Sequence, residues 1–132
     1  MNIRITIRRD LDLMTDTMDQ IIDEVISRNR IFLIRSDRGW VPAVDIYETE
    51  SEIILLAELP GVKKEEIQVT LGNKHVKFCG IRHDIAPKQR IHQMEIDFGK
   101  FERTIKVPAA VTDEGSSATY SDGFLVIRLQ KK

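Results

Sequence analysis

The spacing of the apolar residues changes near residue 40, and the change separates two kinds of structure. Before that point apolar residues recur three and four positions apart, which predicts an amphipathic helix over residues 10–29. Polar residues and Gly39 then predict a linker over 35–39, so that residues 1–39 form an N-terminal arm. The apolar residues of this arm are Leu11, Met14, Met18, Ile21, Ile22, Val25 and Ile26, followed by Ile31, Phe32, Leu33 and Ile34.

From Trp40 to Lys132 the apolar period becomes two, which is the period of a β-strand with one buried face. Short alternating runs, such as that of Met94, Ile96 and Phe98, are separated by frequent turn signals. This pattern predicts an all-β fold, an immunoglobulin-like antiparallel β-sandwich, over residues 40–132. The continuous apolar run 53–57 predicts a central strand, and Pro42 predicts that the strand after it lies at a sheet edge.

The segment "AELPGV" at residues 57–62 interrupts one apolar run with Pro60 and Gly61. Proline presets a turn, glycine accepts a positive φ, and the charges of "KKEE" favour an exposed tip. We therefore interpret this segment as a turn between packed strands and not as a catalytic loop.

The composition describes a globular chain with 42% hydrophobic and 31% charged residues. Its net charge of −1 gives no reason to expect a nucleic acid or an anionic membrane as a partner, and no apolar run is long enough to span a bilayer. Cys79 is the only cysteine, so nothing points to secretion, and we expect a cytoplasmic protein.

Residues capable of catalysis or metal binding do not form a known arrangement. The sequence contains no phosphate-binding glycine motif and no G-x-S-x-G, and His75, His83 and His92 lack the spacing of metal sites. Cys79 alternates with apolar residues and is expected to be a reduced structural thiol and not a nucleophile. We therefore expect no enzyme, no catalytic or metal site, no cofactor and no small-molecule substrate.

Four segments follow one another along the chain: "WVPAVDIYETESEIILLAELPGVKKEEIQVTL", "VKFCGIR", "GKFERTIKVP" and "ATYSDGFLVIRL". The most specific parts are "AELPGV" and Ala118-x-x-x-x-Gly123-Phe124-Leu125. Together they resemble the small heat-shock proteins, the alpha-crystallin family, over residues 40–132. The resemblance implies an ATP-independent holdase chaperone that binds partly unfolded proteins through exposed apolar surface and prevents their aggregation. A co-chaperone or scaffold module of the same fold, binding one folded partner, is the alternative, and the apolar arm favours the holdase.

The apolar residues of the arm are the first candidates for client binding, because adaptable Leu, Met and Ile side chains accept many partners. Packing of the same residues on the sandwich or on a neighbouring subunit explains the pattern equally well. The resemblance implies a second candidate, a groove between two strands. Its residues are Ile67, Val69, Leu71, Ala118 and Tyr120, which ordinary sandwich core would also explain.

The resemblance also implies a homodimer as the building block of a higher oligomer. In bacterial-type members a loop crosses to the first strand of the partner, and here that loop is 83–93, with Ile85 and Ile91. The receiving edge consists of Val44, Asp45 and Ile46. Arg103 matches the arginine of the family and is expected to have a structural role in an ion pair.

The sequence departs from the family pattern after the last strand, where "VIRLQKK" carries no I-x-I/V motif of the kind that fills the groove of a neighbour. This departure puts large closed oligomers in doubt. Ile3, Ile5 and Ile7 have the spacing that sends side chains of a strand to one face. Two interpretations stay open: residues 1–7 add as a strand that fills the groove, or they form a frayed terminus.

Overall fold

Alternation of apolar and polar residues becomes alternation of buried and exposed side chains along the strands. In β9 (Phe124–Lys131) the side chains of Leu125, Ile127 and Leu129 are fully buried, whereas Phe124 is exposed. The computed structural model describes residues 2–10, 13 and 39–132. Within this part of the chain the apolar faces of two sheets pack on each other and form one core.

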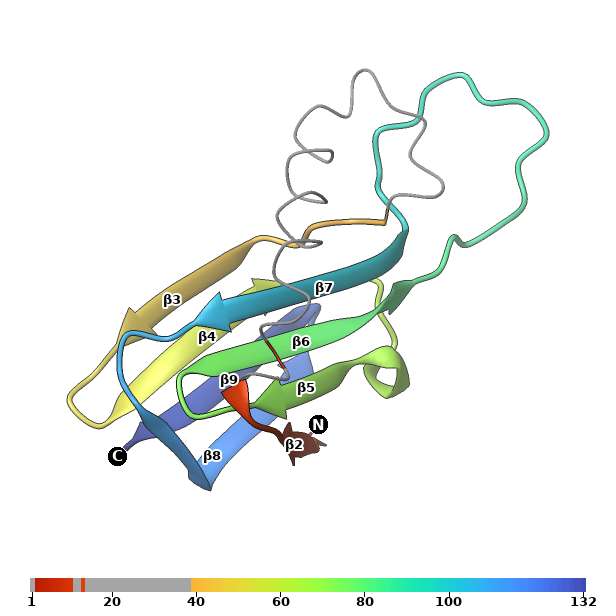
Figure 1. Cartoon of the computed structure of the whole chain (residues 1–132). Coiled ribbons are helices and arrows are strands. Elements are labelled where there is room, and N and C mark those ends of the chain that lie inside the picture. Colours follow the sequence, from red (N-terminus) through yellow and green to blue (C-terminus); the bar gives the residue numbers. More distant parts are fainter. Residues whose placement is uncertain (1, 11–12, 14–38) are drawn as a thin grey trace.

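The two sheets contain the strands in the orders β1-β8-β9-β4-β3 and β2-β5-β6-β7 (Figure 1). Neighbouring strands are antiparallel, except that β2 runs parallel to β5. The predicted all-β sandwich is confirmed. The other strands are β1 (Asn2–Ile3), β2 (Ile5–Ile7), β3 (Val44–Glu48), β4 (Glu52–Glu58), β5 (Gln68–Leu71), β6 (His75–Arg82), β7 (Gly99–Lys106) and β8 (Val111–Ser121), and a 3-10 turn spans Lys64–Glu66.

The positions of β4 and β3 follow the sequence prediction. β4 carries the apolar run 53–57 and lies between β9 and β3, where both of its edges are paired. β3 ends the sheet directly after Pro42, and no described strand pairs with its outer side. Both the central strand and the edge strand are therefore confirmed.

The "AELPGV" segment forms the predicted turn, and its apolar residues enter the core. Gly61 adopts φ 82°, a conformation that favours glycine. Leu59 and Val62 are buried, and the Tyr120 hydroxyl lies 2.7 Å from the Leu59 carbonyl oxygen and 2.8 Å from that of Val62. A tyrosine thus holds this turn from within the sandwich.

A strand over residues 94–98, which the alternation of Met94, Ile96 and Phe98 predicts, is absent from the structure. Residues 83–98 form a loop, and β7 begins at Gly99, opposite the last residue of β6. An extended segment requires a neighbour for its backbone hydrogen bonds. Because β6 ends at Arg82, the sheet offers no such neighbour to residues 94–98, and the prediction is wrong.

The predicted helix over 10–29 falls almost entirely outside the described residues. Asp10 and Leu13 are described, and both are helical. No helix in the described part of the chain has the length and apolar character needed to cross a membrane.

Candidate functional site

The N-terminal segment joins the two sheets at one side of the sandwich. β1 pairs with β8 through Ile3 and Ala118, and β2 pairs with β5, where Ile5 lies opposite Val69. The chain crosses from one sheet to the other at Arg4, between β1 and β2. We call residues 2–10 together with Leu13 the N-terminal clip, because they bridge the edges of both sheets.

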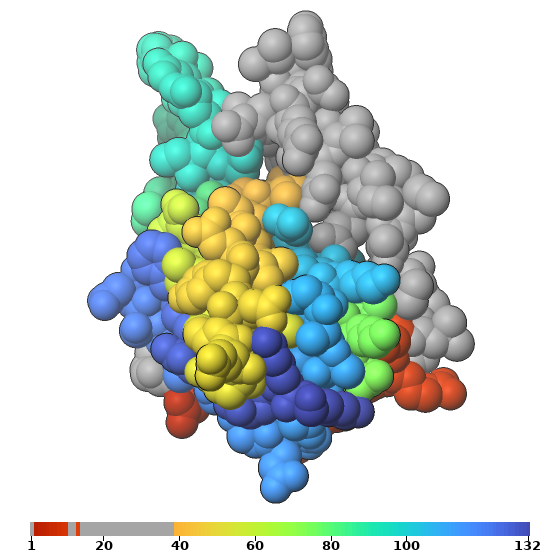
Figure 2. Space-filling model, turned by 90° about the vertical axis from the view of Figure 1, so that its left-hand side faces the viewer, coloured from red at the N-terminus to blue at the C-terminus, as the bar shows by residue number. Residues whose placement is uncertain are grey.

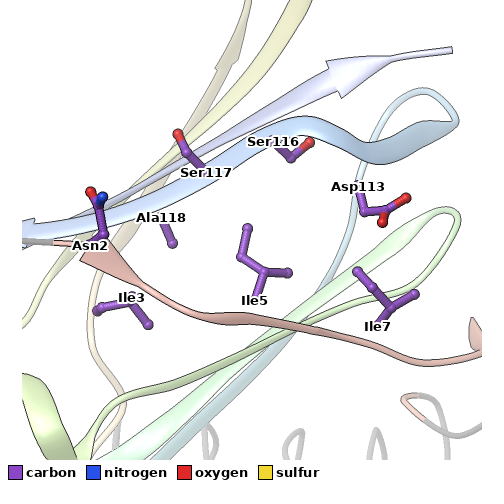
Figure 3. Close-up of a pocket in the computed structure, with 8 residues that line it drawn as sticks. All are labelled: Asn2, Ile3, Ile5, Ile7, Asp113, Ser116, Ser117 and Ala118. Atoms are coloured by element: carbon purple, nitrogen blue, oxygen red, sulfur yellow. The ribbon is translucent and has the colours of Figure 1, made fainter.

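The three isoleucines of the clip differ in how deeply they are buried. Ile3 is 8% exposed and belongs to the core, Ile5 packs against the core, and Ile7 is 52% exposed. Beside them a pocket of about 360 Å³ opens between the clip and β8. Figure 3 shows Ile5 and Ile7 projecting toward β8 across this pocket. It is lined by Asn2, Ile3, Ile5, Ile7, Asp113, Ser116, Ser117 and Ala118.

The structure places the predicted groove residues beneath the clip and in the core. Val69 and Leu71 are on β5, and Ala118 is on β8, so the two strands that the clip bridges carry them. Ile67 and Tyr120 also lie in this cluster, with Tyr120 bound to the "AELPGV" turn. All five side chains are buried together with Ile3.

The far end of the clip is fixed to the turn between β5 and β6. The Lys74 amide donates to the Asp10 carboxylate at 3.1 Å, and His75 Nδ1 lies 3.5 Å from the same carboxylate. A Cβ atom on Gly72 would lie 2.2 Å from Asp10 Oδ1, so only glycine allows this approach. Leu13 packs beside it and is 2% exposed. We call these contacts of Asp10 and Leu13 the catch of the clip.

The protonation of Asp10 is set by the catch. Burial raises the pKa of the Asp10 carboxyl, but hydrogen bonds from the Lys74 amide and contacts with His75 and the Asn73 amide outweigh it. The pKa of Asp10 is therefore lowered from its ordinary value of 3.8. The contacts of the catch therefore stabilise the charged form of the Asp10 carboxylate.

The residues predicted for the dimer lie on an exposed edge and an exposed loop. On β3, Val44 is half-buried, whereas Asp45 and Ile46 are exposed. On the 83–98 loop Ile85 is 93% exposed, and Ile91 is also exposed. Figure 2 shows the loop standing away from the body of the sandwich, at the end from which β3 starts. The isolated chain does not bring the β3 edge and the loop together.

Arg103 supports the chain in front of the β3 edge. Its Nη1 donates to the Pro42 carbonyl oxygen at 2.8 Å. The side chain is only partly exposed and lies on β7, next to the segment that leads into β3. Arg103 thus makes a structural contact, in which the Pro42 carbonyl oxygen is the acceptor.

The predicted client-binding residues of the arm, Leu11, Met14, Met18, Ile21, Ile22, Val25, Ile26, Ile31, Phe32, Leu33 and Ile34, lie outside the described residues. The side chains considered for chemistry are dispersed. The described residues contain no cluster of His, Cys, Asp and Glu that could hold a metal ion. Burial raises the pKa of the Cys79 thiol, and the Glu102 carboxylate adds to the effect, which favours the unreactive protonated thiol.

Two features of the site escaped the sequence reasoning. The Asp10 catch joins residues 64 positions apart, and the only local signal is the glycine in "LGNK". Arg82 lies 3.6 Å above the centre of the Trp40 ring, and no sequence spacing indicates that contact.

Comparison with known proteins agrees with this architecture. A profile of the Hsp20/alpha crystallin family matches residues 45–132. Small heat shock protein C2 of Rickettsia felis is 29% identical over 126 residues, covering 92% of this chain and 82% of the relative. A probable 15 kDa heat shock protein of Leptospira interrogans is 33% identical over 95 residues, covering 72% of this chain and 73% of the relative.

A solved structure leads to the same result. The structure of hspA from Xanthomonas axonopodis superposes with a TM-score of 0.65 at 30% identity, covering 71% of this chain and 96% of that one. The fold is the β-sandwich that the sequence resemblance implied. It carries "AELPGV" as a turn and "GKFER" on β7. By sequence match and by fold, this chain belongs to the Hsp20/alpha-crystallin family of small heat-shock proteins, a family of chaperones.

Proposed function

We propose that this chain is an ATP-independent holdase, which captures partly unfolded proteins on apolar surface and keeps them from aggregating. The observation that carries the proposal is the clip. A short segment, paired through two residues in β1 and three in β2, covers apolar side chains of both sheets. A cover of this kind is removable without unfolding the sandwich beneath it.

The balance of free energy favours exchange between the clip and a client. A client segment that brings its own apolar side chains buries surface worth about 25 cal/mol per Å², which is also what Ile3 and Ile5 gain when they dock. Exchange of one for the other is therefore close to neutral, and the abundance of exposed client segments decides the outcome. Such a site needs no particular client sequence.

The arm adds to the same function. Its apolar side chains, from Leu11 to Ile34, follow the clip directly in the sequence. We propose that they move with the clip and extend the surface that meets the client. Adaptable Leu, Met and Ile side chains suit partners that share no sequence.

We further propose a homodimer in which the 83–93 loop of one copy pairs with the β3 edge of the other. The outer side of β3 is open among the described residues, and an open edge readily recruits another strand. The apolar side chains of Ile46 and Ile85 are exposed and would be covered by such pairing.

The test is the heat-induced aggregation of a model client, followed by light scattering without nucleotide. We expect suppression at a few-fold molar excess of this chain, with no further effect of added ATP. An unrelated protein of the same mass serves as the control for crowding. A client that aggregates at its usual rate at every ratio would contradict the holdase and favour a module that binds one folded partner.

A further inference from the structure

Three segments of the chain meet at the side chain of Arg82, the last residue of β6. Its guanidinium lies 3.6 Å from the centre of the Trp40 ring and 5.4 Å from that of Phe98. Its Nε donates to the Asp97 carbonyl oxygen at 2.9 Å, and Nη2 donates to the same oxygen. Its Nη1 donates to the Pro60 carbonyl oxygen at 3.1 Å.

These contacts hold both ends of the 83–98 loop. Figure 1 shows the loop leaving the sandwich at the end of β6 and returning at the start of β7. Arg82, at the end of β6, binds the carbonyl oxygen of Asp97 just before β7, so one side chain holds the two ends of the loop together. The bond to the Pro60 carbonyl oxygen anchors the pair to the "AELPGV" turn. Three hydrogen bonds and the contact with the Trp40 ring fix the guanidinium in one orientation, which a lysine cannot reproduce.

The same side chain also holds the segment that enters the sandwich at Trp40. The Trp40 amide donates to the Lys100 carbonyl oxygen at 2.9 Å, and its ring contacts Phe101 edge-on at 5.2 Å. A Cβ atom on Gly39 would lie 2.3 Å from the Lys100 carbonyl oxygen, so this approach needs glycine. Trp40 therefore rests on the first residues of β7 on one side and beneath Arg82 on the other.

The setting of Arg82 strengthens these contacts. Burial lowers the pKa of the Arg82 guanidinium, and the Asp97 carboxylate opposes that shift. A cation that has lost part of its water binds an aromatic face more strongly than an exposed one. The stack on Trp40 is thus more than a surface contact.

We infer that Arg82 is a positioning residue, which couples the pose of the 83–98 loop to that of Trp40, and hence couples self-association to the base of the N-terminal arm. The inference rests on the proposed pairing of the loop with a second copy of the chain. Pairing fixes the loop ends, the loop ends fix Arg82, and Arg82 fixes Trp40. Linkage of two equilibria is reciprocal. If dimer formation favours the bound position of Trp40 by some factor, then holding Trp40 in that position must favour dimer formation by the same factor.

Trp40 is the only tryptophan of the chain, so its fluorescence reports directly on this contact. We expect the wild-type protein to show lower acrylamide quenching of Trp40 in the dimer than after dilution to the monomer. Arg82→Ala should raise the dimer Kd about tenfold or more and leave Trp40 equally quenched at all concentrations. Sedimentation equilibrium measures the Kd of each variant.

Two variants control for charge and for folding. Arg82→Lys keeps the charge without the planar stack, and it should resemble Arg82→Ala. Arg128→Ala removes an exposed arginine on β9 that pairs with Glu52, and it should change neither the Kd nor the quenching. If Arg82→Ala fails to fold, Arg82→Lys and the dilution series of the wild-type chain still decide the question.

The outcomes separate this inference from the proposed dimer. Ile46→Lys puts a charge on the β3 edge and should dissociate the dimer. If Ile46→Lys leaves the mass unchanged, the proposed pairing fails and the coupling fails with it. If Ile46→Lys dissociates the dimer while both Arg82 variants keep the wild-type Kd, only the coupling is overturned. Wild-type Trp40 quenching that stays constant as the mass halves overturns the coupling as well.

Discussion

Gly72→Ala should open the N-terminal clip without touching either strand of it. The new Cβ would lie 2.2 Å from Asp10 Oδ1, which forces the carboxylate away from the Lys74 amide. A hydrogen bond to a charged acceptor is worth about 1.5–3 kcal/mol. The Asp10 side chain is 27% exposed, so we reduce this value to about 1–2 kcal/mol, which corresponds to roughly a 5–30-fold larger open population.

Amide hydrogen exchange measures that population. The Arg8 amide donates to the Leu71 carbonyl oxygen at 2.9 Å, next to the catch, and its protection should fall by the same 5–30-fold. The Leu59 amide, which donates to the Gly123 carbonyl oxygen at 2.7 Å, reports on the sandwich and should keep its protection. Unchanged protection at Arg8, or an equal loss at both amides, would refute the catch.

A double-mutant cycle separates the clash from other effects of the added methyl group. In an Asp10→Ala background the carboxylate is absent, so Gly72→Ala should no longer open the clip. Its remaining effect is then the contact of the new Cβ with Leu13 Cδ1 at 3.0 Å, offset because alanine restricts the unfolded chain, so it should lie within about 1 kcal/mol of neutral. Additive effects of the two substitutions would show that they act independently and that the catch has been misidentified.

Three further predictions concern the same regions. Because the pKa of Asp10 is lowered in the folded chain, its contribution to the stability of the closed clip is complete above 3.8 and is lost as the pH falls through the lower folded pKa. The protection of the Arg8 amide should therefore fall with acid in the wild type and not in Asp10→Asn. Ile3→Ala should increase binding of an apolar dye at ambient temperature severalfold by releasing a buried anchor, whereas Ile7→Ala, at an exposed position, should not. Tyr120→Phe removes the hydroxyl that contacts the Leu59 and Val62 carbonyl oxygens, of which Leu59 keeps the Val62 amide as a donor. It should lower the free energy of unfolding in urea by about 1–3 kcal/mol, and an unchanged midpoint would contradict the role of the hydroxyl.

The sandwich was predictable from the sequence because its strands obey a local rule. Alternation placed Leu125, Ile127 and Leu129 on the inner face of β9, and Pro42 marked the edge strand. The rule failed at residues 94–98, because alternation describes a segment suited to pairing and does not supply the partner. Local pattern thus predicts which segments are able to form strands, and the sheet decides which of them do.

The contacts at the candidate site were not predictable in the same way. Asp10 meets Lys74 across 64 positions, and Arg82 meets Trp40 across a shorter but still long stretch of the chain, so neither pair has a signature in spacing. In the sequence, a glycine at position 39 or 72 is explained equally well by a turn or by another group that packs against the backbone. Only the structure shows that the Lys100 carbonyl oxygen packs against Gly39 and the Asp10 carboxylate against Gly72. The isoleucine spacing and the family resemblance did suggest a strand in the groove between the segments of Val69 and Ala118, but they left a frayed terminus equally open, and only the structure gives the pairing register of Ile3 with Ala118 and Ile5 with Val69.

Holding the clip closed by a disulfide is the most direct test of whether the groove beneath it captures clients. Ile3 and Ala118 are directly paired on antiparallel strands, where Cα atoms lie about 4.5–5.5 Å apart, a distance that a disulfide spans. With Ile3→Cys and Ala118→Cys in a Cys79→Ser background, the oxidised protein should lose most of its suppression of client aggregation, and reduction should restore it. Equal suppression in the oxidised and reduced forms would contradict the account.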